Sequence, residues 1–242
     1  NKIKSAFFLG CLISLSVALY LKNSNVQSTA GYWVWKPSDL KQLQNTDEII
    51  IYQGNIIHTN GKFSFRKKGI DIQRLQGRKV TLLVRVYQLP PVEFFTSQIN
   101  YLINEWQQKG VSIKGIQIDY DSPSSKLNEY GAFLHSLNGT YGRNFVSITG
   151  LSSWLTDNIK GVNDLKPYID YVAIQFYQAF LPVYKTEHYI KRLKGLKIDY
   201  KVGVTTSAKF DRYTFDETPH YVGKLVFLNG NQLNKKQEAT NN

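Results

Sequence analysis

The stretch of sequence that decides the fold is Gly115–Ile116–Gln117–Ile118–Asp119–Tyr120–Asp121–Ser122–Pro123. It has the composition of a buried strand that ends in two acidic residues. Because side chains alternate along a strand, Gln117, Asp119 and Asp121 share one face, and the apolar residues between them share the other. Isolated carboxylates are costly to bury, so two of them at the end of an apolar strand predict a functional site.

Short apolar runs like this one recur along the chain and alternate with amphipathic stretches. Eight of them are candidate strands, at residues 32–35, 48–53, 79–89, 115–121, 145–150, 171–177, 201–205 and 223–228. Strands that alternate with helices build parallel sheets through crossover connections, and eight such units close into a barrel. We therefore expect an α/β fold, a single (β/α)8 TIM-like barrel over residues 31–228.

Three connections in this pattern have recognisable features. Helical periodicity is clear at residues 92–108 and 124–137, and Ser124 after Pro123 is placed to cap the second helix. The turn signal Thr59–Asn60–Gly61 predicts a small hairpin after the second strand, with residues 56–58 paired to 62–65. Residues 229–242 are polar and without periodicity, which predicts a flexible tail and a barrel that is incomplete at its C-terminal helix.

The first 30 residues have the layout of a signal peptide or a signal anchor. Lys2 and Lys4 precede an apolar run of 16 residues, 6–21. A spanning helix needs about 20 residues, and Ser28–Thr29–Ala30 offers a small-residue cleavage site, so cleavage and anchoring both remain open. We expect an exported protein, either periplasmic or held at the cytoplasmic membrane by this segment as an anchored or peripheral protein.

Composition excludes several functional classes. The single cysteine, Cys11, lies in the apolar leader, and the four histidines are dispersed without ligand spacing. No metal motif and no thiol or histidine nucleophile pair results, so we expect no cofactor and no metal. The net charge of +12 comes from scattered lysines and arginines, without a nucleic-acid-binding motif. A solvated basic surface, with no nucleic-acid partner, is the expectation.

Active sites of such barrels lie at the carboxyl ends of the strands, which makes Asp119 and Asp121 the candidate catalytic residues. Two neighbouring carboxylates repel, which raises the proton affinity of one and separates an acid from a charged partner. Such a pair suits glycosidic bond cleavage, with Asp121 as general acid and Asp119 as its charge partner. In the alternative interpretation, Asp121 caps the next helix and Asp119 binds a backbone or arginine partner.

Eight further residues are candidates for binding a substrate. They are polar side chains on inward strand faces or aromatic side chains suited to sugar rings, namely Arg85, Tyr87, Gln117, Gln175, Tyr177, Trp33, Trp35 and Trp154. Alternation places Arg85 inward as a partner for Asp119, because a buried arginine without a carboxylate is costly. The alternatives are a polar plug inside the barrel for the glutamines and tyrosines and a core role for the tryptophans.

The fourth-strand segment resembles glycoside hydrolase family 18, whose fourth strand carries the motif DGxDxDxE. Asp119 falls on the last motif aspartate, whereas Lys114 and Gln117 replace the two earlier ones and Asp121 replaces the catalytic glutamate. Tyr177 is similar to the tyrosine of that family's Met-x-Tyr segment, and the resemblance implies a role for it in holding an N-acetyl group.

A resemblance that covers nearly the whole barrel is to a bacterial family, domain of unknown function 3142. It is carried by residues 31–35, 83–86, 115–125, 147–154 and 170–177, and it implies a TIM barrel without a defined activity.

Together these observations predict an exported glycoside-hydrolase-like barrel that acts on a polysaccharide or glycan by acid-assisted cleavage. No carboxylate ends the seventh strand, which disfavours a retaining pair split between two strands and agrees with a substrate-assisted or inverting scheme. The alternative is a non-catalytic glycan-binding or envelope-associated barrel, and the replacement of the motif glutamate by Asp121 favours it. Carbohydrate is the expected partner in both cases.

Overall fold

The computed structural model describes residues 30–43, 48–68, 72–178, 181–206, 210, 212–215 and 218–228. The expected leader, apart from Ala30, and the expected tail at 229–242 lie outside the described residues. Within these ranges, no helix combines the length and the apolar composition needed to cross a bilayer.

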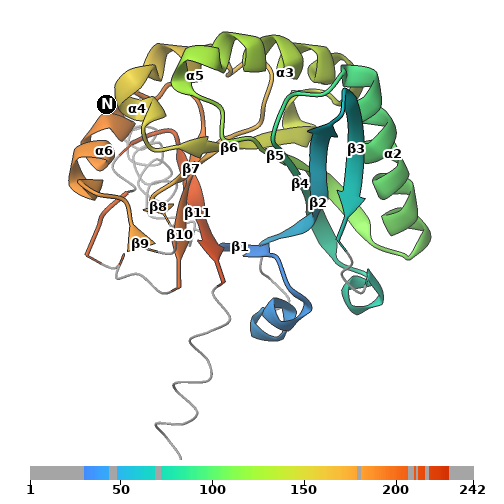
Figure 1. Ribbon diagram of the computed structural model, residues 1–242. Coiled ribbons are helices and arrows are strands. Elements are labelled where there is room, and N and C mark those ends of the chain that lie inside the picture. The colour runs from blue at the N-terminus through green and yellow to red at the C-terminus, as the bar shows by residue number, and fades with distance from the viewer. Residues whose placement is uncertain are drawn as a thin grey trace, which may run out of the picture.

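Eight parallel strands form a closed barrel (Figure 1). In spatial order they are β1 (Gly31–Val34), β2 (Glu48–Thr59), β4 (Lys79–Val86), β5 (Ser112–Asp119), β6 (Val146–Leu151), β7 (Val172–Gln175), β10 (Tyr200–Thr205) and β11 (Tyr221–Phe227). The first strand pairs with both β2 and β11, and this double pairing closes the sheet. The expected (β/α)8 barrel is confirmed, although several strand boundaries differ.

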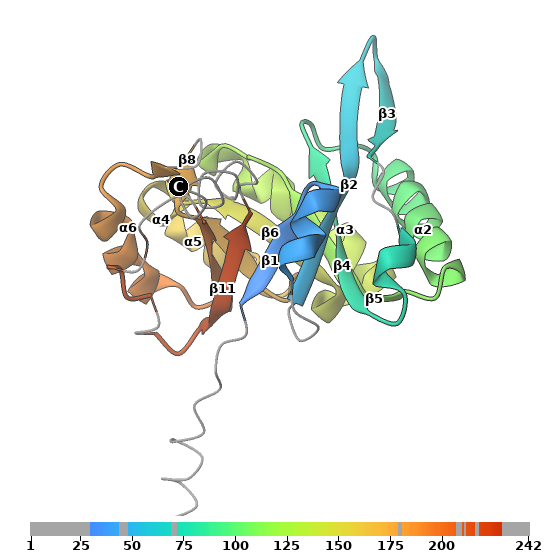
Figure 2. The same cartoon turned by 90° about the horizontal axis from the view of Figure 1, so that it is seen from below.

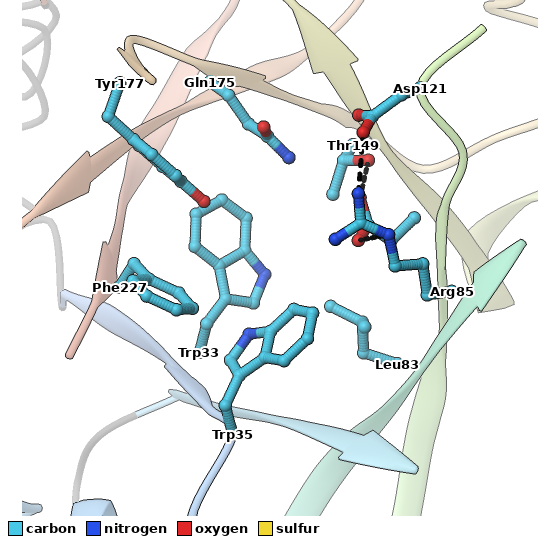
Figure 3. A pocket seen from close by; sticks show the side chains of 10 residues that line it. Trp33, Trp35, Leu83, Arg85, Asp121, Thr149, Gln175, Tyr177 and Phe227 are labelled. Atoms are coloured by element: carbon cyan, nitrogen blue, oxygen red, sulfur yellow. Dashed lines mark hydrogen bonds and ion pairs between the residues drawn. The ribbon is translucent and has the colours of Figure 1, made fainter. Parts of the chain in front are cut away.

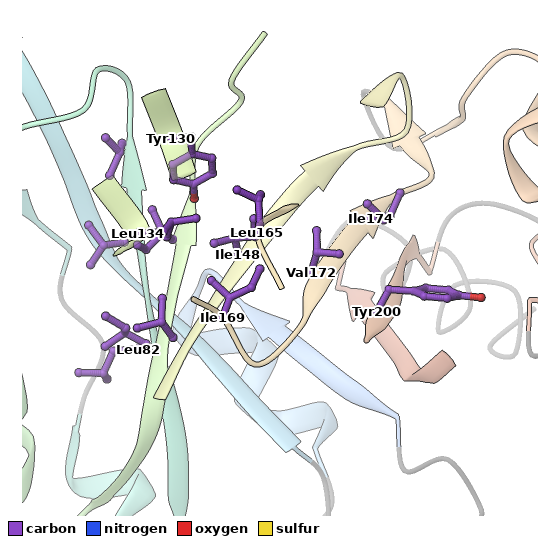
Figure 4. Packing of buried hydrophobic residues seen from close by; sticks show 14 of the residues in the cluster. Leu82, Tyr130, Leu134, Ile148, Leu165, Ile169, Val172, Ile174 and Tyr200 are labelled. Carbon is purple, nitrogen blue, oxygen red and sulfur yellow. The ribbon is translucent and has the colours of Figure 1, made fainter. Parts of the chain in front are cut away.

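Alternation along the strands produces two separate apolar clusters. The outward residues of the strands pack against the helices in a large core that includes Leu82, Ile148 and Tyr130 (Figure 4). The inward residues form a smaller cluster inside the barrel around Trp33, Leu83 and Tyr171. Fully buried parallel strands of this kind need apolar or paired polar residues on both faces, as observed.

The helices agree with one of the two expected helical segments and differ from the other. They are α2 (Val92–Gln108), α3 (Leu127–Tyr141), α4 (Trp154–Asp157), α5 (Ile159–Asp164) and α6 (Thr186–Arg192), with short 3-10 turns η1 (Pro37–Gln42), η2 (Ile72–Leu75), η3 (Ser124–Lys126), η4 (Arg143–Phe145) and η5 (Leu193–Gly195). The helix at 92–108 is confirmed. The segment expected as one helix at 124–137 begins with a 3-10 turn, and Ser124 lies inside that turn without capping it.

The second strand continues beyond the barrel wall as one arm of a hairpin with β3 (Lys62–Lys67). The strand expected at 48–53 and the hairpin arm expected at 56–58 are therefore a single strand, whose register shifts between Tyr52 and Gly54. Gly54 has φ 149°, and a Cβ there would lie 2.2 Å from the Arg66 carbonyl oxygen. Figure 2 shows the hairpin projecting past the end of the barrel.

The strands that carry the candidate site end earlier than expected. β5 ends at Asp119, so Asp121 lies in the loop that follows. β7 ends at Gln175, and after Phe176 the chain enters a small antiparallel ladder of β8 (Tyr177–Gln178) and β9 (Leu181–Pro182). The chain turns away here because the Phe176 carbonyl accepts a hydrogen bond from the Val183 N–H.

At the amino end of the strands, the barrel interior contains a buried ion pair between Glu48 and Lys201. Lys114 reaches the same glutamate at 3.4 Å, and the ammonium group of Lys201 lies 4.4 Å from the ring centre of Tyr171. Burial alone raises the pKa of Glu48, but the charges of the two lysines lower it overall. Burial lowers the pKa of Lys201, and Glu48 opposes this shift.

Candidate functional site

A pocket of about 210 Å³ lies at the carboxyl ends of the barrel strands (Figure 3). Its lining consists of aromatic and polar side chains: Trp33, Trp35, Leu83, Arg85, Asp119, Asp121, Thr149, Gln175, Tyr177 and Phe227. They come from both halves of the sequence, because closure of the barrel brings β1 and β11 beside one another.

Arg85 bridges the two aspartates. Its Nη2 donates a hydrogen bond to Asp121 Oδ2 at 2.9 Å, and its Nε lies 3.7 Å from Asp119 Oδ2. The other oxygen of Asp119 accepts a hydrogen bond from the Thr149 hydroxyl at 2.8 Å. The expected pairing of Arg85 with Asp119 is confirmed. Asp121 caps no helix and instead pairs with the same guanidinium group.

Asp119 and Asp121 differ in their exposure to solvent. The Asp119 side chain is 6% exposed, whereas that of Asp121 is 44% exposed. Burial raises the pKa of Asp119, and the charge of Asp121 adds to this effect. Arg85 and the hydrogen bonds from Thr149 and Gln175 lower the pKa but do not reverse the shift. Asp119 is thus the carboxyl group in this pocket that retains a proton above its usual pH range.

The opposite side of the pocket is aromatic. Trp33 is buried, and its indole N–H donates to Gln117 Oε1 at 2.5 Å, which fixes the ring from below. Trp35 stacks on Tyr52 with ring centres 4.0 Å apart. Trp35 is only partly buried, and a rigid ring of this kind suits the apolar face of a sugar.

Two polar groups complete the lining between the aromatic side and the carboxylates. Gln175 and Tyr177 both turn toward the space that Trp33 borders (Figure 3). Burial raises the pKa of Tyr177, so its hydroxyl stays protonated at neutral pH and can donate a hydrogen bond. The ring of Tyr177 also stacks on that of Phe227, with the ring centres 5.8 Å apart, and this contact limits the motion of Tyr177.

The structure brings seven of the ten expected site residues together in this pocket. Three others lie elsewhere. Gln117 lies deeper in the barrel, where it also donates to Ser147 and Tyr171. Tyr87 is 60% exposed beyond the end of β4, with the Arg85 guanidinium 5.4 Å from its ring centre.

Trp154 is fully buried between strand and helix, and its indole N–H donates to the carbonyl of Ser122 at 2.8 Å. It therefore supports the loop that carries Asp121 from behind. Its position follows from the chain: β6 ends at Leu151, so Trp154 begins α4 and no longer follows strand alternation.

Sequence reasoning missed Thr149 and Phe227. Both lie on the inward face of their strands, Thr149 two residues after the inward Ser147, and Phe227 two residues after the inward Leu225. The alternation of Ser147 and Thr149 with apolar residues was a usable signal for an inward polar face. For Phe227, only the closure of the barrel places it beside β1.

A second hollow of about 820 Å³ continues from this pocket. The two share Arg85, Asp121, Gln175 and Tyr177. The hollow runs toward α6 and is further lined by Leu151, Ser152, Ser153, Gln178, Val183, Tyr184, Lys185, His188 and Tyr189. We call it the outer groove. The volume of the outer groove lies within the range of about 300–1,000 Å³ that is common for small-molecule pockets.

In the part of the chain that the structure describes, no group of three or more His, Cys, Asp or Glu side chains is arranged to hold an ion. The chemistry available in the pocket is that of the two carboxyl groups, the guanidinium group, the amide and the hydroxyls.

Comparison with known proteins agrees with the barrel. Residues 76–183 match the family described as "Domain of unknown function (DUF3142)", which confirms the expected resemblance over that range. No curated protein matches the chain.

Two solved structures of chitinases are similar to this chain. One is the catalytic domain of a family GH18 chitinase from the fern Peteris ryukyuensis, with 13% identity and a TM-score of 0.55, over 87% of this chain and 98% of that one. The other is the ICChI chitinase from Ipomoea carnea, with 15% identity and a TM-score of 0.49, over 82% and 94%. At 13% identity, the similarity to the fern enzyme shows the fold alone, which is the same kind of closed β/α barrel.

Proposed function

We propose that this barrel binds a sugar residue of a glycan in the pocket and cleaves a glycosidic bond with acid assistance. The observation that carries the proposal is Arg85, which contacts both Asp119 and Asp121 at the carboxyl ends of the strands. Glycoside hydrolysis needs one protonated and one charged carboxyl group. Arg85 lowers the pKa of Asp119, but burial and the charge of Asp121 raise it by more.

The burial of Asp119 and its raised pKa support one assignment of the two roles. Asp119 gives its proton to the glycosidic oxygen as the bond from that oxygen to the anomeric carbon breaks. Asp121, which is partly exposed, accepts a proton from the water molecule that adds to the anomeric carbon. This assignment exchanges the roles expected from the sequence, where Asp121 was the acid.

The aromatic side and the polar groups position the sugar in this scheme. Trp35 offers a ring face, and Gln175 and Tyr177 donate hydrogen bonds to sugar oxygens. Asp119 and Asp121 are the carboxylates among the described residues that line the pocket. In the proposed scheme water attacks the anomeric carbon directly, and a single displacement of this kind inverts its configuration.

A second function, glycan binding without cleavage, is favoured by one specific observation. Both aspartates are already engaged in the free protein, Asp121 with Arg85 at 2.9 Å and Asp119 with Thr149 at 2.8 Å. Carboxylates held in this way serve to accept hydrogen bonds from sugar hydroxyls. The aromatic side of the pocket would bind the sugar ring in the same way in both functions.

One experiment separates the two. The protein is incubated with a panel of polysaccharides, the release of reducing ends is measured, and binding is measured on the same panel. Asp119→Asn is expected to lower the rate by about 10²–10⁴-fold and to keep binding. Asp164→Asn, an exposed aspartate on α5, serves as the matched control. If the unmodified protein binds a glycan but cleaves none, the second function, glycan binding without cleavage, is the one that remains. If it binds no glycan, both functions are overturned.

A further inference from the structure

The lining of the outer groove includes a second cation besides Arg85, which is Lys185. This residue is exposed, and its ammonium group lies 5.3 Å from the ring centre of Tyr184. Among the described residues it forms no ion pair. Asp121 is the carboxylate among the described residues that line the groove, and Arg85 already compensates it. The lining of the groove therefore has a net positive charge, which comes from Lys185.

The backbone at Lys185 is left-handed, with φ 59° and ψ 40°. A residue with a Cβ pays a steric cost there, and Gly or Asn adopts this conformation most readily. The other left-handed residue that is not glycine in the described chain is Asn60 in the hairpin turn. The turn alone would favour Asn or Gly at position 185, so the presence of lysine indicates a use for its side chain.

Tyr184 adds a second recognition element at the same place. Its side chain is 83% exposed, the largest value among the exposed apolar and aromatic residues described. A tyrosine ring in this position offers a stacking face for a sugar, next to the ammonium group of Lys185. His188 and Ser153 line the same groove and supply hydrogen-bond partners.

We propose that the outer groove is a second subsite, in which Lys185 and Tyr184 bind an acidic sugar, so that the substrate is an anionic polysaccharide. The inference rests on the proposed binding of a glycan in the pocket and names its chemical class. The pocket and the groove share four lining residues, so they adjoin. The sugar in the pocket and the acidic sugar in the groove are therefore parts of one glycan chain. Tyr184 stacks on that sugar, and Lys185 pairs with its carboxylate.

The test uses matched probes that differ in charge alone. Oligogalacturonate and hyaluronan hexasaccharides are compared with their carboxyl-reduced derivatives, and dissociation constants are measured by calorimetry. We expect the acidic probe of at least one pair to bind about three- to fivefold more tightly at low salt, the value of one exposed ion pair. The difference should shrink as salt is raised.

Three variants assign the effect. Lys185→Asn keeps the left-handed backbone accessible and is expected to bring each pair within twofold. Lys185→Arg keeps the charge and is expected to retain the preference. Lys166→Asn removes an equal charge from an exposed lysine that does not line the groove, and it is expected to change nothing.

Equal affinity of the unmodified protein for acidic and neutral probes would overturn the acidic subsite and leave the proposed function standing. A preference that survives in Lys185→Asn would also overturn it. Failure of all four probes to bind, by a protein that binds another glycan of the panel, would overturn this inference and leave the proposed function standing.

Discussion

Replacing Glu48 by glutamine should destabilise the barrel and leave the pocket intact. Glu48 and Lys201 lie at the amino end of the strands, with side chains 14% and 10% exposed. Removing one partner of a buried ion pair typically costs about 3–5 kcal/mol. The lower end applies here, because the Tyr171 ring remains beside Lys201 and a glutamine can still accept a hydrogen bond. We expect a loss of about 3 kcal/mol.

For a chain of this length, each kcal/mol lowers the melting temperature by about 2–4 °C, so the variant should melt about 6–12 °C lower. Thermal and urea unfolding measure this directly. The double variant Glu48→Gln/Lys201→Met should recover part of the loss, because it leaves no unpaired charge. Asp164→Asn, in an exposed pair, should change stability by less than about 0.5 kcal/mol.

The pH dependence gives an independent check on this reasoning. Burial lowers the pKa of Lys201, and Glu48→Gln removes the charge that opposes the shift. The folded state of the variant then releases the Lys201 proton before the unfolded state does, so its deficit should shrink as the pH rises toward about 10.4. Exposed ion pairs typically contribute about 0.5 kcal/mol. If the free energy of unfolding of Glu48→Gln lay within about 0.5 kcal/mol of that of the unmodified protein, the reasoning would be refuted.

Two further predictions follow from buried groups near the rim. Burial raises the pKa of Asp119, so its contribution to stability is present in acid and is lost as the pH rises through that pKa. Asp119→Asn should therefore gain stability relative to the unmodified protein from about pH 4 to pH 7 in urea unfolding, and a difference independent of pH would contradict this. Gly54→Ala should destabilise the hairpin by more than about 2 kcal/mol, because its Cβ would lie 2.2 Å from the Arg66 carbonyl oxygen. Gly61→Ala, at φ 73° with open space around it, should cost only about 1–2 kcal/mol. If Gly54→Ala and Gly61→Ala lost equal amounts of stability and of amide protection in the hairpin, the close contact with the Arg66 carbonyl oxygen would have no role.

Much of the candidate site was predictable because it depends on local alternation. The inward direction of Asp119, Arg85 and Gln175 follows from the period of two, and the active end follows from the parallel order of the strands. Tyr177 followed the same rule, although it lies just past the end of its strand. These residues needed no knowledge of distant contacts.

The remaining features depend on where strands end and on which strands meet. Asp121 leaves the strand because β5 ends at Asp119, and its partner Arg85 is set by the neighbouring strand. The bulge before Gly54 merges two expected elements into one. Phe227 reaches the pocket only because β11 pairs with β1. Long-range pairing of this kind has no local signature in the chain.

The hairpin of β2 and β3 has a consequence for the direction in which a polymer can lie. In the order of the closed barrel, β2 and β7 stand on opposite sides of the pocket. The hairpin rises past the rim on the first side (Figure 2), whereas the outer groove opens on the second. For a polymer bound as proposed, the way out over β7 is open, whereas the hairpin stands past the rim over β2. The proposed function together with this asymmetry predicts processing from a chain end rather than cutting at internal bonds.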